Sequence, residues 1–314
     1  MKKQLLMSFL FLLSFVLLAA CGNDNDSAKT KKEEQPAERV VKTVKGEVKI
    51  PVEPKRIADI SGSTEELLIF GYTPIITANT SEQKIMPFLQ DQLKDTKPVG
   101  SFWGDEINTD TILTAKPDLI IINNRQEKLY DQLSKIAPTV MLETDLSEWR
   151  PKFEEIARIM DKEEEANKWL KKFDEKAKAT HDEIIAKTGE EKFMVMAAYP
   201  NAFRVYGNYG YGSFLFEDLK LPAIEGTPTE EPLIQLQKEA LIDYNPDYLF
   251  VFTTGDGDQR LKEFRHSAIW KNMNAVKNNK VFMIAPEDLN KGYTPLGKEL
   301  LLEEVKQQIL QAAK

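Results

Sequence analysis

The pattern of apolar and polar residues alternates short apolar runs with longer amphipathic stretches from about position 39 onwards. Continuous apolar runs such as 119–122 and 248–252 are typical of strands buried on both faces of a parallel sheet. Amphipathic stretches between such strands favour helices, so the order of elements predicts an α/β fold. Further strands are expected over 48–52, 56–60, 75–78, 139–142, 193–198, 203–206 and 280–284. Helical segments are expected over 112–116, 128–136, 241–244 and 295–313.

One phrase occurs twice along the chain. Lys-Pro-Asp at 116–118 and Asn-Pro-Asp at 245–247 each follow a helical stretch and precede an apolar strand. This repetition implies two lobes of one design, and 314 residues are enough for each lobe to bury its own core. In the first lobe, Ser63 and Glu66 have the spacing of a capping box and predict the start of a helix.

A long polar stretch over 163–188 separates the two halves. Its apolar residues recur at spacings close to three and four, which predicts one amphipathic helix with a solvated charged face. We expect this helix to be the single rigid connection between an N-terminal α/β lobe at 39–162 and a C-terminal α/β lobe at 189–314.

The N-terminus has the pattern of a secretory signal over residues 1–20, with two lysines, an apolar run and a small-residue boundary before Cys21. The apolar run is shorter than the roughly 20 residues of a membrane-spanning helix, so a transmembrane anchor is the weaker alternative. The Leu-Ala-Ala-Cys sequence at 18–21 resembles the bacterial lipobox, in which the cysteine is diacylated. Residues 21–38 are expected to form a flexible tether. The protein is therefore expected to be exported and anchored by lipid.

Charge and composition exclude several classes of function. The chain has 42 Lys and Arg against 50 Asp and Glu, a formal net charge of -8, which argues against nucleic acid as a partner. Two histidines and one cysteine cannot supply the usual zinc or thiol site. The sequence has no G-x-S-x-G, P-loop or H-E-x-x-H motif, which argues against a secreted α/β enzyme, although an acid-base carboxylate pair stays open.

Several phrases, taken in order and spacing, resemble the iron-siderophore substrate-binding lipoproteins of Gram-positive ABC importers. They are Cys21, the polar tether, the long helix, and the sequences at 54–57, 116–120, 136–139, 245–247 and 270–277. The glycine-punctuated sequence at 205–212 is most similar to the ferric hydroxamate branch. The resemblance implies a class III binding-protein fold, with two Rossmann-like lobes joined by a single long helix, a ligand between them and little hinge movement.

The resemblance also implies a function. The protein is expected to be a monomeric receptor without enzymatic activity or cofactor, lipid-anchored on the outer face of the cytoplasmic membrane. It would bind a ferric siderophore, whose own oxygens hold the iron, and deliver it to an ABC permease and its ATPase.

A cleft for such a ligand needs aromatic walls and a few donors directed at the iron-bound oxygens. Trp103 lies in a turn that, by the resemblance, faces the cleft. The alternative is core packing, which is the ordinary role of a tryptophan. Arg125 follows the strand at 119–122, at the carboxyl end where α/β sheets place ligand-binding residues. A surface ion pair is an equally good interpretation of Arg125.

The second half contains further candidate binding residues. Arg204 shares one strand face with Tyr206, and the resemblance gives Arg204 a contact with the ligand. Tyr209 and Tyr211 are expected to project from a glycine-rich loop. The Trp-Gly-Arg-Gly phrase of the family is Tyr-Gly-Tyr-Gly at 209–212 here, so a donor is missing unless Tyr211 or Arg204 supplies it.

Tyr199 and Tyr293 are further candidates for the rim of the cleft, with core packing as the alternative for each tyrosine. Arg125 and Arg204 are the only basic candidates for the cleft, whereas the tri-catecholate binders of this fold have a basic cluster there. A hydroxamate or citrate-hydroxamate complex is therefore favoured. Cobalamin or haem is the alternative ligand within the same fold. Haem would need an axial tyrosine, because His181 and His266 lie outside the cleft motifs.

Two glutamates are candidates for contacts with the permease. Glu106 and Glu239 each precede a repeated Pro-Asp strand, one in each lobe. By resemblance such glutamates pair with arginines of the permease, where charges of this kind set orientation and encounter rate. The alternative is that both are ordinary solvated glutamates.

Overall fold

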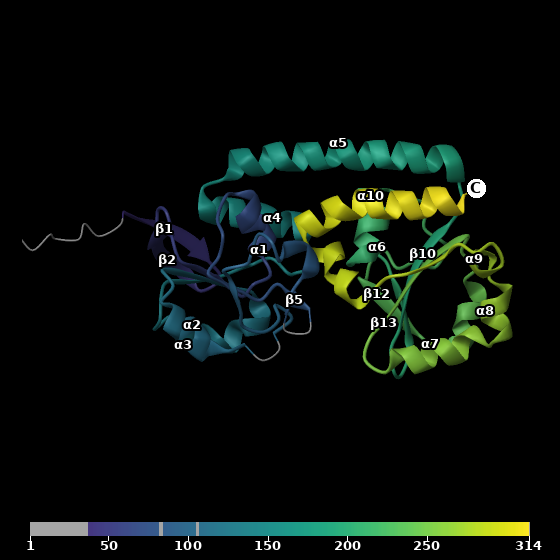
Figure 1. The fold of residues 1–314 in the computed structure, drawn as a ribbon, viewed down its shortest axis with the longest axis horizontal. Coiled ribbons are helices and arrows are strands. Elements are labelled where there is room, and N and C mark those ends of the chain that lie inside the picture. Colours follow the sequence, from purple (N-terminus) through teal and green to yellow (C-terminus); the bar gives the residue numbers. More distant parts are fainter. Residues whose placement is uncertain (1–36, 82–83, 105–106, 314) are drawn as a thin grey trace, which may run out of the picture. The chain divides into compact units, whose positions relative to one another are not determined.

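The computed structural model describes residues 37–81, 84–104 and 107–313. Residues 36–314 form one compact unit that contains two five-stranded sheets and their covering helices (Figure 1). The predicted signal, Cys21, the tether up to residue 36 and Glu106 lie outside the described residues. Among the helices that are described, none combines the length and apolarity needed to cross a bilayer.

The N-terminal sheet is entirely parallel, as the apolar runs predict. Its strand order is β7 (Lys97–Pro98), β4 (Ile76–Thr77), β3 (Ile57–Asp59), β8 (Leu119–Ile122) and β9 (Thr139–Met141). All four residues of β8 are buried, because alternate side chains enter core clusters on opposite faces of the sheet. The helical segments of this half are α1 (Thr64–Ile69), η1 (Pro87–Leu89), α2 (Thr109–Ala115), η2 (Asn124–Leu129), α3 (Tyr130–Leu133) and α4 (Trp149–Met160).

The C-terminal sheet is mixed. Its order is β12 (Leu233–Leu236), β11 (Phe203–Tyr206), β10 (Phe193–Ala198), β13 (Tyr248–Thr253) and β14 (Val281–Met283). The strand β11 is antiparallel to both of its neighbours, whereas β10, β13 and β14 are parallel. Its helical segments are α6 (Tyr211–Ser213), the π-helical η3 (Phe214–Asp218), η4 (Lys238–Asp243), α7 (Gly257–Arg265), α8 (Ala268–Asn272), α9 (Asn274–Lys277) and η5 (Pro286–Tyr293).

The repeated Pro-Asp phrase has the same structural role in both halves. Asp118 accepts hydrogen bonds from the backbone N–H groups of Lys55 at 2.7 Å and Arg56 at 2.9 Å, just before β3. Asp247 accepts one from the N–H of Lys192 at 2.8 Å, just before β10. Each aspartate therefore satisfies backbone donors at the start of the neighbouring parallel strand and fixes its register.

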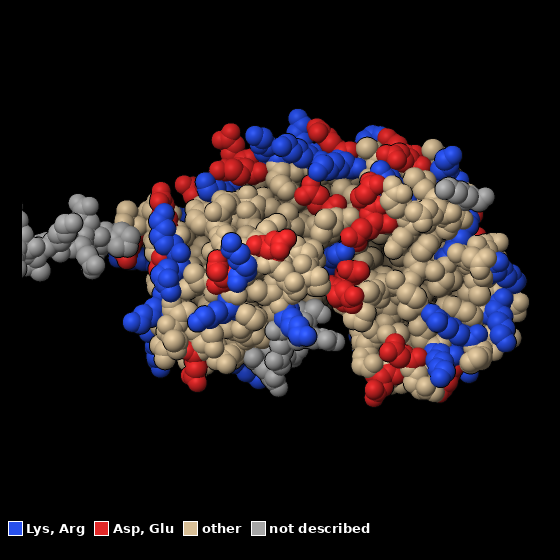
Figure 2. Space-filling model, viewed as in Figure 1, with Lys and Arg blue, Asp and Glu red and all other residues tan. Residues whose placement is uncertain are grey.

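The long helix predicted over 163–188 is α5 (Glu163–Thr188). A second long helix, α10 (Pro295–Ala312), runs beside it (Figure 1). Because the N–H of Gly297 in α10 donates to Glu65 of α1 at 2.9 Å, α10 also holds the two halves together. The contact of α10 is non-covalent and adds to the connection that the chain makes through α5. The charged residues of α5 form a mixed, exposed face (Figure 2).

The predicted capping box at Ser63 is wrong. The Ser63 side chain makes no capping hydrogen bond and instead accepts from the Ser61 hydroxyl at 2.8 Å. The partner expected to cap, Glu66, is buried and forms an ion pair with Lys152 of α4 at 2.8 Å. A buried carboxylate requires a charged partner, and that requirement outweighs the local capping geometry.

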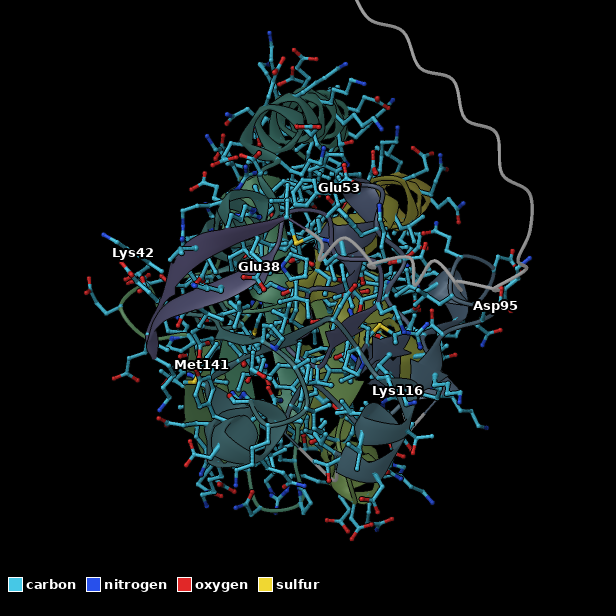
Figure 3. All side chains as sticks on the ribbon, turned by 90° about the vertical axis from the view of Figure 1, so that its left-hand side faces the viewer. Glu38, Lys42, Glu53, Asp95, Lys116 and Met141 are labelled. Atoms are coloured by element: carbon cyan, nitrogen blue, oxygen red, sulfur yellow. The ribbon has the colours of Figure 1, made fainter. Side chains whose placement is uncertain are left out.

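A hairpin of β1 (Glu38–Thr43) and β2 (Gly46–Pro51) precedes the first lobe. Val41 and Ile50 enter the core, while Lys42 on the opposite face points into solvent (Figure 3). Only the second of these strands was expected, and the first begins at Glu38 inside the predicted tether. A short pair, β5 (Thr80–Ser81) and β6 (Lys84–Ile85), completes the described strands.

Candidate functional site

A cavity of about 570 Å³ lies between the two lobes. Every predicted ligand-binding residue lines it. Three of them lie in loops and 3-10 segments, and four lie in the region from the end of β10 to the start of α6. These are Trp103, Arg125, Tyr199, Arg204, Tyr209, Tyr211 and Tyr293. On the edge of the molecule opposite α5, the surface is notched between the lobes (Figure 2).

An aromatic series forms the wall of this cavity. Trp103 of the N-terminal lobe packs edge-on against Tyr293, with 5.0 Å between ring centroids, and Tyr293 packs edge-on against Tyr209 at 4.9 Å. Tyr206 continues the series at 6.3 Å from Tyr209 and 5.2 Å from Phe252 of β13. These separations fall in the range of favourable aromatic pairs, so the wall holds its geometry across the boundary between the lobes.

Arg125 lies just after the carboxyl end of β8, as predicted. Asn123 fixes this strand end, because its side chain caps η2 and also donates to the carbonyl groups of Ser61 and Phe102 at 2.9 and 3.0 Å. The Arg125 guanidinium lies 5.2 Å from the Trp103 ring centroid. The surface ion pair that was the alternative for Arg125 is not found among the described residues.

Arg204 and Tyr199 form the opposite side of the cavity. The Arg204 guanidinium lies 3.7 Å above the centroid of the Tyr199 ring, which follows β10 directly. The Tyr199 hydroxyl is 3.2 Å from that of Tyr206. Because Arg204 and Tyr206 are two residues apart on β11, they share the predicted face, while Phe203 faces the core.

The loop at 207–212 places both Tyr209 and Tyr211 in the lining of the cavity, but Tyr211 is the more buried of the two. Gly210 has a φ of +53°, and a Cβ there would lie 2.7 Å from the Tyr293 ring, so only glycine fits. Tyr211 is 7% exposed and belongs to the core at the start of α6. The expectation that both rings project outward is therefore wrong for Tyr211, although Tyr211 is part of the cavity lining.

Burial keeps the cavity tyrosines neutral. Desolvation raises the pKa of Tyr206, Tyr209, Tyr211 and Tyr293 above the ordinary value for a phenol. For Tyr206, the hydrogen bond with Tyr199 raises the pKa further. Neutral hydroxyl groups can donate hydrogen bonds to a ligand, whereas phenolates would be needed to coordinate iron directly.

Several cavity residues were not predicted. Asn290 accepts a hydrogen bond from the Trp103 indole N–H at 3.2 Å and so joins η5 to the N-terminal lobe. Phe252, Leu289 and Thr254 also line the cavity. Phe252 was placed on a buried strand, and its position at the carboxyl end could have identified it. Nothing in the local sequence marks Asn290, since its contact crosses the lobes.

Among the residues that the structure describes, Asp145 is the acidic one in the cavity lining. Burial would raise the pKa of this carboxyl group, but hydrogen bonds from the backbone and hydroxyl of Ser147, at 3.0 and 2.8 Å, lower it below its usual value. Asn124 and the charge of Arg125 lower it further. Asp145 is therefore ionised, and its oxygens accept hydrogen bonds from Ser147 of its own loop and from Asn124 of η2.

The predicted contact residue Glu239 lies on η4 and is exposed. Glu239 lies six residues before Asn245, where the second copy of the repeated phrase begins. The residue six before Lys116, where the first copy begins, is Asp110, which lies on α2 and is also exposed. The repeat therefore pairs Glu239 with Asp110. The other predicted residue, Glu106, is outside the described part of the chain.

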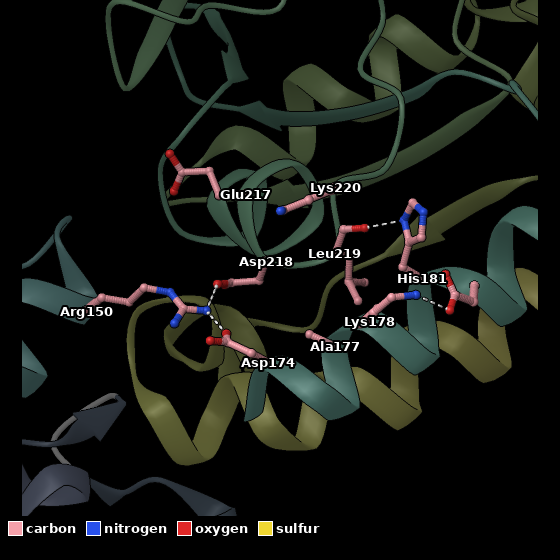
Figure 4. Close-up of a pocket in the computed structure, with 10 residues that line it drawn as sticks. Arg150, Asp174, Ala177, Lys178, His181, Glu217, Asp218, Leu219 and Lys220 are labelled. Atoms are coloured by element: carbon pink, nitrogen blue, oxygen red, sulfur yellow. Dashed lines mark hydrogen bonds and ion pairs between the residues drawn. The ribbon is translucent and has the colours of Figure 1, made fainter. Parts of the chain in front are cut away.

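A second cavity, of about 630 Å³, lies between α5 and η3 (Figure 4). Most of its charged side chains pair with one another: Arg150 contacts Asp174 at 2.7 Å and Asp218 at 3.1 Å, and Lys178 contacts Asp182 at 2.6 Å. Because these ion pairs occupy most of the charged groups of the lining, few of them are available to a ligand. We therefore assign the candidate site to the interlobe cavity.

The comparisons with known proteins agree with the two-lobed architecture. Residues 60–287 match the model of the periplasmic binding protein family. The chain is 31% identical over 295 residues to the iron(3+)-hydroxamate-binding protein FhuD of Bacillus subtilis, covering 90% of this chain and 91% of that protein. It is 30% identical over 307 residues to the iron(3+)-hydroxamate-binding protein YxeB of the same organism, covering 90% and 89%.

Solved structures extend this similarity to the fold. The crystal structure of Staphylococcus aureus SirA complexed with staphyloferrin B has a TM-score of 0.75 and 29% identity, covering 87% of this chain and 98% of that chain. The petrobactin-binding protein YclQ of Bacillus subtilis has a TM-score of 0.68 and 25% identity, covering 87% and 99%. The predicted fold class and the resemblance to siderophore-binding lipoproteins are confirmed, and the relatives are substrate-binding proteins of transporters, not enzymes. This chain belongs to the periplasmic binding protein family.

Proposed function

We propose that the protein binds a ferric siderophore of the hydroxamate or citrate-hydroxamate type between its lobes and delivers it to an ABC importer. The observation that carries this proposal is the convergence of all seven candidate residues on one interlobe cavity. Among the relatives named above, FhuD and YxeB are iron(3+)-hydroxamate-binding proteins, SirA is complexed with staphyloferrin B and YclQ is a petrobactin-binding protein. All four support a ferric siderophore as the ligand, and the first two support a hydroxamate.

The chemistry of the cavity suits a complex whose iron is already fully coordinated. Aromatic rings offer apolar surface to the siderophore backbone, and neutral tyrosine hydroxyls and guanidinium groups offer donors to the iron-bound oxygens. The raised pKa values of Tyr206 and Tyr293 disfavour a phenolate, which the haem alternative would need as an axial ligand. The siderophore is therefore the better candidate cargo, and the iron travels as part of that cargo.

We propose the remaining organisation on the basis of sequence and family. Residues 1–20 are removed as a signal, Cys21 carries the lipid, and the tether between Cys21 and the start of β1 at Glu38 holds the body at the outer face of the cytoplasmic membrane. The lobes extend over 39–162 and 189–314, with the helix 163–188 between them. Two acyl chains would give stable anchoring, since a single chain is marginal.

We propose that the exposed ends of α2 and η4 contact the permease. Glu239 retains its predicted role, and Asp110 is its equivalent in the first lobe, in addition to Glu106. Leu113 and Ile242, each three residues before the repeated phrase, are 57% and 68% exposed. Each lobe thus exposes one acidic and one apolar side chain at equivalent positions. Such an arrangement suits a partner with two similar halves, each of which contacts one lobe.

Quenching of tryptophan fluorescence tests the binding function. The soluble mature body would be titrated with ferrichrome, ferrioxamine E, ferric schizokinen, a ferric tri-catecholate, haem and cobalamin, with iron-free siderophores as controls. Trp103 lines the cavity, so a bound ferric complex should quench it in a saturable manner. Trp103→Phe should reduce the amplitude, whereas Trp169→Phe on α5 should retain the ligand-dependent change.

Absence of a response to every iron complex, confirmed by calorimetry, would contradict the proposed function. A response confined to haem or cobalamin would retain the fold and replace the cargo.

A further inference from the structure

We propose that Glu65 is a positioning residue for ligand binding: from the N-terminal lobe it caps the N-terminus of α10, and it thereby fixes η5, which carries three residues of the cavity lining. This inference rests on the proposed siderophore-binding function and adds a residue outside the cavity. Of the residues that the structure describes, Glu65 is not among those that line the cavity. It therefore acts through the residues that it holds in place, not through contact with the ligand.

The segment η5 belongs to the second half of the sequence, but it is attached to the first lobe. Three of its residues line the cavity: Leu289, Asn290 and Tyr293. The Asn290 side chain accepts a hydrogen bond from the indole N–H of Trp103 at 3.2 Å and donates one to the carbonyl group of Thr80 at 3.4 Å. Leu296, at the start of α10, packs against the core cluster of the N-terminal lobe. Contacts with the N-terminal lobe thus place the side of the cavity that η5 forms.

The N-terminus of α10 depends on Glu65. The side chain of the N-cap residue, Thr294, makes no capping hydrogen bond to the described backbone, and its hydroxyl donates to the carbonyl of Asn290 at 3.4 Å. Pro295 has no N–H to donate. The N–H of Gly297, in the first turn, donates to Glu65 Oε2 at 2.9 Å. A carboxyl group at this position satisfies a helix-terminal donor and interacts favourably with the helix dipole, so the other lobe supplies the cap of α10.

Two glycines bring this segment into close contact with its neighbours. A Cβ at Gly297 would lie 2.5 Å from the Cα of Lys291, so the first turn of α10 packs directly on the backbone of η5. A Cβ at Gly292 would lie 2.6 Å from the backbone nitrogen of Tyr211, so η5 packs directly on the glycine-rich loop. A displacement of the first turn of α10 therefore moves η5, and with it the ring of Tyr293.

The surroundings of Glu65 make this contact depend on protonation. Glu65 is buried, and burial together with the charge of Glu66 raises its pKa to about 7. The N–H of Gly297, the hydroxyl of Thr294 and the charge of Lys152 from α4 oppose this shift. The docked arrangement of α10 therefore binds a proton at Glu65 more tightly than an arrangement in which this side chain is in water.

The other charged groups around this contact have partners of their own. Lys291 of η5 contacts Glu304 at 2.8 Å, and Lys298 of α10 contacts Asp218 at 2.7 Å. Asp59 of β3 accepts hydrogen bonds within its own lobe. Burial also raises the pKa of Asp59 and of the carboxyl group next to Glu65 on α1, so a substitution at position 65 is needed to isolate its titration.

Titration calorimetry at pH 6 and pH 8 tests the proposal with ferrioxamine E, ferrichrome and ferric schizokinen, whose hydroxamates are bound to iron. Glu65→Ala removes the acceptor and should weaken binding by roughly tenfold at pH 6. Glu65→Gln keeps a neutral acceptor and should bind within about twofold of the unmodified protein at pH 6. Because docking favours the protonated group, the affinity of the unmodified protein should fall by roughly threefold or more from pH 6 to pH 8, and that of Glu65→Gln should not.

Glu155 provides the matched control. It is a buried carboxylate of the same lobe that accepts backbone N–H groups within that lobe, from Glu143 at 2.9 Å and Thr144 at 3.0 Å. Glu155→Ala should lower the melting temperature and leave ligand affinity unchanged. Equal weakening of binding by Glu155→Ala and Glu65→Ala would show that loss of stability alone lowers affinity, and it would overturn the proposal.

Gly297→Ala tests the same contact from the side of α10. The added methyl group would meet the backbone of Lys291, so binding should weaken although every residue of the cavity lining is retained. Combined with Glu65→Ala, the losses should be less than additive, because both changes release the same segment. Additive losses, or unchanged affinity in both single variants, would contradict the role of Glu65.

Thermal melts establish that the variants are folded. If Glu65→Ala does not fold, the pH profile of Glu65→Gln and the affinity of Gly297→Ala decide the question. If no ferric complex binds to the unmodified protein, the proposed function itself fails. Binding that is insensitive both to pH and to these substitutions would refute only the role of Glu65.

Discussion

The ionisation of Glu65 depends on its position between the lobes. Burial and the neighbouring charge of Glu66 raise its pKa from the ordinary value to about 7, although the N–H of Gly297 donates to it. The folded protein thus binds a proton at Glu65 more tightly than the unfolded chain does. The stability from this group is complete below about pH 4.5 and is lost as the pH rises to about 7.

We therefore predict that Glu65→Gln reduces the pH dependence of unfolding. The unmodified protein should lose up to about 3 kcal/mol of unfolding free energy between pH 5 and pH 8 through ionisation of Glu65. The variant should not show this loss, because its neutral side chain does not ionise in the core. Urea denaturation at both pH values measures the difference. The exposed Glu154→Gln is the control, and an equal pH dependence in Glu65→Gln and the unmodified protein would refute the assignment.

The two tyrosines of the glycine-rich loop should behave differently when truncated. Tyr209→Ala should weaken ligand binding by about 1 kcal/mol and leave the melting temperature nearly unchanged, because its ring faces the cavity. Tyr211→Ala should mainly destabilise, by about 3 kcal/mol, because its ring is in the core. Titration calorimetry and thermal melts of both variants separate the two effects. A large loss of stability in Tyr209→Ala would show that its ring is structural.

At the scale of elements, a buried ion pair joins η3 to α10. Lys298 is 0% exposed and contacts Asp218 at 2.7 Å, and Arg150 of α4 contacts the same carboxylate at 3.1 Å. Burial lowers the pKa of Lys298, and the charge of Asp218 opposes that shift. Removal of one partner from a buried pair leaves an uncompensated charge, which is far more costly than the pair itself.

Asp218→Ala should therefore lower the free energy of unfolding by about 3–5 kcal/mol. Asp174→Ala removes the exposed partner of the same Arg150 and should cost less than about 1 kcal/mol. Chemical denaturation of the two variants gives the comparison. Similar losses in both would mean that Asp218 is not the centre of this network.

At the scale of the whole molecule, binding and delivery should be separable. Asp110→Arg and Glu239→Arg reverse the charge of exposed residues outside the cavity, so ligand affinity should be unchanged. Uptake of radioactive iron by cells that carry the combined variant should fall several-fold, because repulsion slows the encounter with the permease. Glu175→Arg on α5 should have no effect. Unchanged uptake in the double variant would exclude these residues from the contact.

The sequence by itself determined the elements whose signals are local. The apolar run of β8, the heptad-free amphipathic pattern of α5 and the duplicated Pro-Asp phrase each predicted a structure that was found. The position of Arg125 followed from the rule that ligand-binding residues lie after the carboxyl ends of parallel strands.

Only the tertiary structure decided the contacts between distant segments. Nothing local distinguishes Tyr211 from Tyr209, yet the fold buries Tyr211 at the start of α6 and leaves Tyr209 partly exposed. The same holds for Glu66, which pairs with Lys152 instead of capping its helix. Burial, unlike periodicity, depends on which elements pack together, and in this protein the two lobes and α10 set that arrangement.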